Sequence, residues 1–132
     1  ILDMGSGTGV LSIVASKNGA KQVVGIDIDE WAFQNSIDNA KLNNTENISF
    51  LHGDIKLIEN QDFDIILANI NRNIIEKDIE EYYNLLSDKG DLLISGFLVE
   101  DVDFIINLSI NNRFNVINKK NKGQWSMVHL RK

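Results

Sequence analysis

The sequence contains no cysteine and no proline among its 132 residues. The absence of cysteine excludes disulfide bonds, thiolate nucleophiles and thiolate metal ligands. Only two histidines are present, His52 and His129, and they lie far apart in the sequence, so we expect no metal site. No apolar run approaches the length needed to span a bilayer, and no signal peptide is visible. We therefore expect a cytoplasmic protein without a membrane partner.

Positive charge is also scarce, since the formal net charge is −6. A protein that binds the phosphate backbone usually has a basic face, so we expect no direct nucleic-acid partner. A chain of 132 residues that is 43% hydrophobic can bury the core of one domain, and we predict a single domain spanning residues 1–132. Ile1 is not a natural start and the chain opens inside an expected strand, so we expect further residues upstream.

Apolar stretches rich in β-branched residues alternate with stretches of helical periodicity along the chain. The pattern predicts strands at 1–4, 22–28, 48–53, 63–69, 91–98, 114–120 and 124–132. It predicts helices at 8–18, 30–42, 73–86 and 102–110. This alternation predicts an α/β fold with a doubly wound, mostly parallel seven-stranded sheet and an antiparallel hairpin at the C-terminus.

Certain residues mark the helical periodicity of each expected helix, and we expect those of the third helix to face inward. In the first two helices these are Val10, Leu11, Val14 and Ala15, and then Trp31, Ala32, Asn35, Asn39 and Leu42. In the third they are Ile75, Ile79, Tyr82, Tyr83 and Leu86. We interpret Tyr82, Tyr83 and the late Trp125 as packing residues and not as catalytic ones.

Residues 3–9 read DMGSGTG, a glycine-rich turn between an expected strand and an expected helix. Gly5, Gly7 and Gly9 lack the Cβ that would obstruct a ligand against the backbone. The dinucleotide pattern G-x-G-x-x-G is not completed, because Val10 stands where its third glycine belongs, and the lysine of the Walker pattern is missing as well. Asp3 would repel a phosphate and suit a cationic amino group. We favour such a ligand over the alternative of a tight turn that binds nothing.

Two aspartates follow the second strand. In doubly wound sheets an acid about 20 residues past the glycine loop hydrogen-bonds the hydroxyls of a ribose, and Asp27 has that place. Asp29 precedes the helical pattern that begins at Glu30, so we assign it to capping the helix and Asp27 to the ribose. Ile28 lies between the two and is placed to cover one face of a base.

Polar side chains also end the third and fourth strands. Asp54 can accept a hydrogen bond from an exocyclic amine such as that of adenine, with Ile55 packing on the ring; a turn aspartate is an equal alternative. Asn69 ends the fourth strand, where an amide can accept from an amine N–H. The alternative for Asn69 is a helix cap, a role that Asn71 or Asn73 would fill equally well.

A nucleoside cofactor with an amino group and no phosphate is S-adenosylmethionine. The run DMGSGTGVLSIVASKNGAKQVVGIDID resembles the cofactor-binding half of the Rossmann-like (class I) methyltransferases, and the resemblance covers essentially the whole chain. Within that class, VVGIDID, FDIILANI, the strand ending SGFL and the closing KGQWSMVHL are most similar to the ribosomal protein L11 methyltransferases. Enzymes that methylate glutamine side chains or nucleobase amines usually carry Asn-Pro-Pro-aromatic where this chain has Asn69-Ile70-Asn71-Arg72.

The resemblance implies a role for each of these positions. The loop of Gly5, Gly7 and Gly9 would lie under the methionine part of the cofactor, with Asp3 near its amino group. Asp27 would hold the ribose, and Ile28, Asp54 and Ile55 the adenine. Asn69 would face the methyl group and the incoming amine. The resemblance also implies an upstream domain that binds the ribosomal protein, and we expect that domain to lie outside this chain.

The reaction implied is a direct displacement of the methyl group from a sulfonium by an amino group, either of a lysine side chain or of the α-amine. Such a reaction needs positioning more than it needs a covalent intermediate or a base. Three alternatives stay open: a methyltransferase that acts on a glutamine side chain or an RNA base, a cofactor-binding module without activity, and an NAD-dependent oxidoreductase, which Val10 disfavours.

Overall fold

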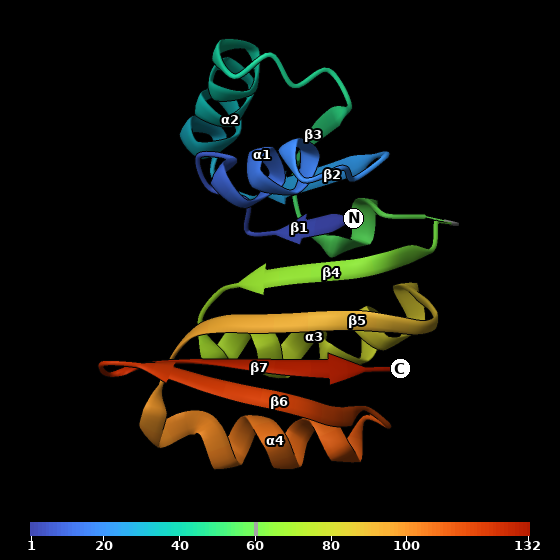
Figure 1. The fold of residues 1–132 in the computed structure, drawn as a ribbon, viewed down its shortest axis with the longest axis vertical. Helices are drawn as coiled ribbons and strands as arrows, with labels where there is room; N and C mark the ends of the chain where they lie inside the picture. The colour runs from blue at the N-terminus through green and yellow to red at the C-terminus, as the bar shows by residue number, and fades with distance from the viewer. Residues whose placement is uncertain (60) are drawn as a thin grey trace. The chain divides into compact units, whose positions relative to one another are not determined.

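The computed structural model describes residues 1–59 and 61–132. The chain divides into two units, Ile1–Asn60 and Gln61–Lys132, each built on its own strands (Figure 1). In the described residues no helix is both long enough and apolar enough to cross a membrane.

The first unit is a set of parallel strands joined by crossover helices, as parallel pairing requires. Its strands are β1 (Leu2–Met4), β2 (Val23–Asp27) and β3 (Ile48–His52), in the order β3-β2-β1. Helix α1 (Val10–Lys17) joins β1 to β2, helix α2 (Glu30–Leu42) joins β2 to β3, and the short 3-10 helix η1 (Ile55–Leu57) follows β3. Both α-helices pack on β2 and β3.

A glycine in β2 sets how closely the elements of this unit pack. A Cβ built on Gly25 would lie 2.6 Å from two ring carbons of Phe50 on β3 and 3.0 Å from the hydroxyl oxygen of Ser12 on α1. Glycine therefore leaves the space that the Phe50 ring and the start of α1 occupy. This explains a glycine inside a strand, where it otherwise weakens the structure.

Helix α1 buries residues other than those that mark its apolar periodicity. Ser12 and Ile13 are buried, whereas Val10 and Val14 are 58% and 51% exposed. The physical reason is an anchor at the start of the helix, where both the backbone N–H and the hydroxyl of Ser12 donate to the carboxylate of Asp3. That anchor turns Ser12 inward, and the apolar spacing alone does not reveal it.

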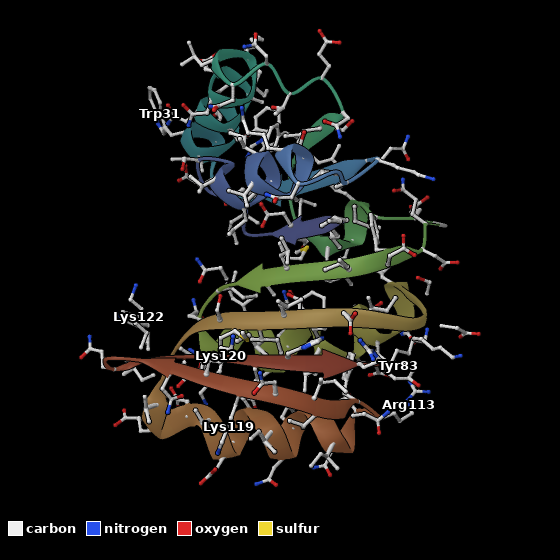
Figure 2. The ribbon with its side chains drawn as sticks, viewed as in Figure 1. Trp31, Tyr83, Arg113, Lys119, Lys120 and Lys122 are labelled. Carbon is white, nitrogen blue, oxygen red and sulfur yellow. The ribbon has the colours of Figure 1, made fainter. Side chains whose placement is uncertain are left out.

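Helix α2 also buries residues other than those that mark its periodicity. Its buried residues are Ser36 and Ala40, whereas Trp31 and Leu42 are 80% and 79% exposed. Figure 2 shows the Trp31 side chain projecting outward from the helix. Small residues face inward because the glycine loop comes close: a Cβ on Gly9 would lie 3.1 Å from the Cβ of Ser36. The spacing of apolar residues does not indicate the buried face of α2, because close packing leaves room only for small side chains there.

The second unit contains four strands in the order β4-β5-β7-β6. They are β4 (Phe63–Asn69), β5 (Leu86–Leu98), β6 (Asn115–Lys122) and β7 (Trp125–Arg131). Strands β4 and β5 are parallel, and β7 runs antiparallel to both β5 and β6. The predicted C-terminal hairpin is thus confirmed, with its turn at 123–124 in place of 121–123.

Helix α3 (Arg72–Leu85) packs on β4 and β5, and helix α4 (Val102–Asn111) packs on β6, β7 and α3 (Figure 1). The short 3-10 helix η2 (Val99–Asp101) leads from β5 into α4. The fully buried side chains of this unit include Ile66, Ile75, Ile79, Tyr82, Ile94, Ile105, Val128 and Leu130. Strand β6 is exposed along its whole length, and Lys119, Lys120 and Lys122 extend from it (Figure 2).

Strand β5 begins at Leu86, five residues before the predicted start at residue 91. Leu86 pairs with Phe63, and the register then shifts so that Ile65 pairs with Asp91. The hydroxyl of Ser87 donates to the Phe63 carbonyl oxygen at 3.0 Å within this irregular stretch. The intervening polar residues carry no strand pattern, so the sequence could not show that pairing already begins at Leu86.

The packing at Gly25 can be tested by substitution. We expect Gly25→Ala to lower the free energy of unfolding by about 1–3 kcal/mol, because the added methyl group overpacks against the Phe50 ring. Urea denaturation measures the change. Adding Phe50→Leu should recover part of the loss in a double-mutant cycle. A Gly25→Ala effect below about 0.5 kcal/mol, or strictly additive effects, would show that this space is not limiting.

Candidate active site

The glycine loop joins β1 to α1 in a tightly turned conformation. Gly5, Gly7 and Gly9 all have positive φ angles, of 65°, 53° and 80°. The N–H of Ser6 donates to the carbonyl oxygen of Ile26 at 3.0 Å, and that of Gly9 to the carbonyl oxygen of Ser6 at 2.8 Å. Left-handed backbone favours glycine at each of these three positions. The loop is therefore fixed to the end of β2 by backbone bonds as well as by its own turns.

The surroundings of Gly7 and Gly9 differ. A Cβ on Gly9 would lie 3.0 Å from the Phe50 ring, so Gly9 serves the packing of the protein itself. A Cβ on Gly7 would meet no protein atom within 4 Å. Space beside the backbone of Gly7 is thus open, as the prediction of close ligand approach requires.

Asp3 at the end of β1 is buried, with 1% of its surface exposed. Its Oδ2 accepts from the Ser12 N–H at 2.9 Å and from the Ser12 hydroxyl at 2.6 Å. Its Oδ1 is buried and has no hydrogen-bond partner among the described residues. Burial raises the pKa of Asp3; the bonds from Ser12 oppose this, and the charge of Asp27 adds a small further rise. An anionic group with one unpaired oxygen is costly to bury, and a cationic donor would offset that cost.

Asp27 at the end of β2 has a role that the sequence did not reveal. Its Oδ2 accepts from the Gly7 N–H at 2.8 Å, and its Oδ1 accepts from the Asp29 N–H at 2.9 Å. The Asp27 carboxylate thus links the backbone of the glycine loop to the backbone at the start of α2. Each carboxylate oxygen can accept more than one bond, so the predicted bond to a ribose stays compatible with this arrangement.

Asp29 is the N-cap of α2, as predicted, and its Oδ1 accepts from the Ala32 N–H at 2.8 Å. Ile28 is 70% exposed, so its side chain is accessible for the predicted contact with a base. His52 is exposed, with its ring stacked on Phe33 and its Nε2 lying 3.1 Å from the Ile28 carbonyl oxygen. These contacts place the His52 ring beside Phe33 and the backbone of Ile28.

Asp54 caps the short helix η1, where its Oδ1 accepts from the Lys56 N–H at 3.0 Å. This is the turn role that was the equal alternative to binding adenine. Ile55 is 5% exposed and belongs mainly to the core of the first unit. The contact of Asp54 and Ile55 with adenine stays a prediction.

Asn69 ends β4 in the second unit, and its side chain is exposed. Its Oδ1 accepts from the Ser95 hydroxyl at 3.0 Å. Asn71 is the N-cap of α3 and accepts from the Ile74 N–H at 3.2 Å, so the capping alternative belongs to Asn71. Asn69 is thus held by the neighbouring strand β5 and has no capping bond in the described residues.

Sequence reasoning missed the residues that position these groups. Ser12 fixes Asp3, Ser95 fixes the amide of Asn69, and Gly96 gives that amide room, since a Cβ on Gly96 would lie 2.8 Å from its Oδ1. Serine in a helix or a strand carries no signal of such a bond, because each partner comes from a different element. Among the described residues, no cluster of histidine, aspartate and glutamate side chains is arranged to hold a metal ion.

Comparisons with known proteins agree with this geometry. Residues 1–132 match the model of the family described as Ribosomal protein L11 methyltransferase (PrmA). A curated relative of that name from Bacteroides thetaiotaomicron is 41% identical over 129 residues, which cover 97% of this chain and 46% of the relative.

Solved structures give the same result for the fold. The crystal structure of ribosomal protein L11 methylase from Lactobacillus delbrueckii subsp. bulgaricus has a TM-score of 0.93 at 29% identity, covering 98% of this chain and 67% of that chain. The M. jannaschii TYW2 structure in complex with AdoMet has a TM-score of 0.75 at 19% identity, covering 98% and 66% of the two chains. At that identity the likeness shows the fold alone.

The predicted α/β fold of seven strands is therefore confirmed, and it is that of the Rossmann-like (class I) methyltransferases. More particularly, the chain belongs to the ribosomal protein L11 methyltransferase family. It spans about half the length of the curated relatives it matches.

The buried carboxylate predicts a pH dependence of stability. Because burial raises the pKa of Asp3 in the folded state, its stabilising contribution is complete below the unfolded-state pKa and is lost as pH rises through the folded-state pKa. Asp3→Asn removes this loss. We therefore expect the unfolding free energy of Asp3→Asn, relative to the wild type, to increase from about pH 3.5 to pH 7, around the usual aspartate pKa. Urea denaturation across that range measures it.

Asp38→Asn is the matched control, because that carboxylate lies on the surface of α2 with 73% of its side chain exposed. Stability curves for Asp3→Asn and wild type that run parallel across this range would contradict the assigned cost of burying Asp3.

Proposed function

We propose that this chain is the cofactor-binding and catalytic part of an enzyme that transfers methyl groups from S-adenosylmethionine to amino groups of ribosomal protein L11. The acceptors are lysine side chains or the α-amine. The observation that carries the proposal is the match of the whole chain, residues 1–132, to the family of that name. We further propose that a domain outside this chain binds the ribosomal protein, and that the enzyme acts in the cytoplasm.

The residues of the first unit fit the cofactor. The unpaired, buried Oδ1 of Asp3 suits a donor that is also a cation, as the amino group of S-adenosylmethionine is. The open space at Gly7 suits its methionine part, and a neighbouring fold of this class was solved with AdoMet bound. We assign the ribose to Asp27, and the adenine to Ile28, Asp54 and Ile55.

Asn69 is the residue that we assign to the acceptor amine. Its carbonyl oxygen accepts from the Ser95 hydroxyl at 3.0 Å. An amide oxygen has two lone pairs, so one remains for an amine N–H. An amine held in this way has its own lone pair directed away from Asn69, and such orientation is the main catalytic contribution that the protein makes.

The chemistry proposed is a direct displacement. When bound, S-adenosylmethionine supplies an activated methyl group on a sulfonium. The amine nitrogen forms the new bond to the methyl carbon while the carbon–sulfur bond breaks, and the amine proton passes to solvent. Asn69 cannot act as a base, so the amine must arrive neutral, although the pKa of a free lysine is about 10.4.

The cofactor assignment can be tested with a matched pair of glycines. Gly7 and Gly19 both have positive φ, of 53° and 94°, and a Cβ at either would meet no atom within 4 Å. Alanine at either position should therefore cost a similar backbone strain, of roughly 1–2 kcal/mol.

We expect only Gly7→Ala to weaken binding of S-adenosylmethionine, by about tenfold or more, because its methyl group enters the space assigned to the ligand. Titration calorimetry on the full-length protein measures this. Equal affinities in the two variants would remove the loop from the cofactor site. Heat from NAD in place of S-adenosylmethionine would favour the oxidoreductase alternative.

The role of Asn69 can be tested in the full-length enzyme. We expect Asn69→Ala to lower kcat about a hundredfold with little change in cofactor affinity, because the lost bond acts on the orientation of the amine. Mass spectrometry of ribosomal protein L11 should locate the methyl groups on lysine or the α-amine. Asn112→Ala, which removes an amide that donates to the Leu108 carbonyl oxygen at the end of α4, is the control. Turnover near the wild-type value, or methyl groups found only on glutamine or RNA, would contradict the proposal.

A further inference from the structure

Positive charge is concentrated at the C-terminal end of the chain. Residues 113–132 contain six of the 13 Lys and Arg residues and none of the 19 Asp and Glu residues. All of the carboxylate side chains therefore lie in residues 1–112, and the net charge of −6 conceals a basic segment. A net charge averaged over the whole chain does not reveal a local basic face, which is what binding to a nucleic acid requires.

Three of these cations lie on β6, the last strand in the order of the sheet. Lys119, Lys120 and Lys122 extend from this strand, whose residues are all exposed, and we name the three lysines the basic edge (Figure 2). Within residues 1–59 and 61–132 none of them is in an ion pair, whereas Arg131 on β7 is paired with Asp91. The charges of the basic edge are therefore available to a partner from outside the chain.

The basic edge presents charge on both faces of β6. Lys119 pairs with Val128, which is fully buried, whereas Lys120 pairs with Met127 on the opposite face. Residues two apart in a strand share a face, so Lys120 and Lys122 lie on one side, separated by about 6.5 Å along the strand. That spacing is similar to the distance between adjacent phosphates of a nucleic-acid strand. Both ammonium groups can therefore contact the same phosphate backbone.

The outer side of β6 is poorly suited to pairing with a further strand. The register between β6 and β7 shifts between Val116 and Asn118, and both irregularities and lysines on an edge strand oppose strand addition. A phosphate chain needs no regular ladder of hydrogen bonds, because its oxygens accept from lysine side chains and from single backbone N–H groups. Protection of the edge would account for a lysine in β6, but not for the lack of carboxylates throughout residues 113–132.

We propose that the basic edge binds the phosphate backbone of RNA. Lys120 and Lys122 contact phosphates from one face of β6, and Lys119 contacts the backbone from the other. The contact is electrostatic and does not depend on the base sequence. The choice of RNA among polyanions rests on the function proposed above, because a ribosomal protein assembles with RNA. The binding itself adds a second surface to the enzyme and is measured without methyl transfer.

The test measures binding of a fluorescein-labelled RNA stem-loop to the full-length protein, by fluorescence anisotropy over a range of salt concentrations. The variant combines Lys119→Gln, Lys120→Gln and Lys122→Gln, which keep the side-chain length and remove the charge. We expect it to bind at least about tenfold more weakly at roughly 0.1 M salt. The slope of log Kd against log salt concentration should fall by about 2–3, since each lost phosphate contact removes about 0.7–0.9.

The matched control combines Lys17→Gln, Lys21→Gln and Lys89→Gln. These three lysines are also exposed and also lie outside the ion pairs of the part of the chain that the structure describes, so the net charge changes equally. We expect the control to bind RNA within about twofold of wild type, because charges farther than a Debye length from the phosphates are screened. Arginine at all three positions of the basic edge keeps the charge and should bind within about threefold of wild type.

The three single variants cover the case in which the triple variant aggregates, and each should reduce the slope by about one. Wild-type protein that does not bind the RNA overturns the proposal. So do equal losses in the two triple variants, and so does poly-glutamate that binds as tightly as the RNA, which would indicate an acidic polypeptide as the partner. Wild-type enzyme that binds RNA but leaves L11 unmethylated refutes the proposed function and not the binding surface.

Discussion

The bond between Asp3 and Ser12 is the constraint on which the first unit depends. Two donors from one serine hold one carboxylate oxygen at 2.6 and 2.9 Å, and the other oxygen is left buried without a partner. The bond fixes the rotation of α1, so that a serine faces the core and two valines face solvent. It also fixes the glycine loop, which must span from Asp3 to that helix. One interaction therefore sets both the packing of the unit and the anionic group offered to a ligand.

Asp27 completes the same loop from the neighbouring strand. It holds the backbone of Gly7 from one side while Gly9 packs against Phe50 from the other, so the turn has its shape before any ligand is bound. A preformed loop loses little conformational entropy on binding, which is the usual means by which a small set of contacts yields useful affinity. Of Gly7 and Gly9, it is Gly7 that has open space beside it, which favours close approach at that part of the turn.

The fold and the turns between its elements follow from local rules, whereas the positioning contacts do not. Strand alternation, a glycine-rich turn between β1 and α1 and the capping aspartate Asp29 each depend on neighbours in sequence, and these predictions were confirmed. The binding role of the glycine loop stays a prediction. In α1 and α2 the apolar spacing does not mark the buried face, because tertiary contacts at Ser12 and Ser36 outweigh it. Ser95 was missed because its partner, Asn69, lies on another strand. The sequence shows which polar groups are present, but the contacts between groups on different elements depend on the tertiary structure.

If Asn69 faces the acceptor amine, as proposed, an amide in place of a base is sufficient at the end of β4. A base beside the amine would favour its deprotonation, but as an anion it would also attract the ammonium form, which has no lone pair to transfer. The amide of Asn69 carries no net charge, so its attraction for the ammonium form is weaker than that of a carboxylate. In the proposed reaction it would accept a bond from either form but orient the neutral one for transfer. An amine repeatedly methylated keeps a lone pair until it is quaternary, so the same neutral surroundings suit each successive transfer.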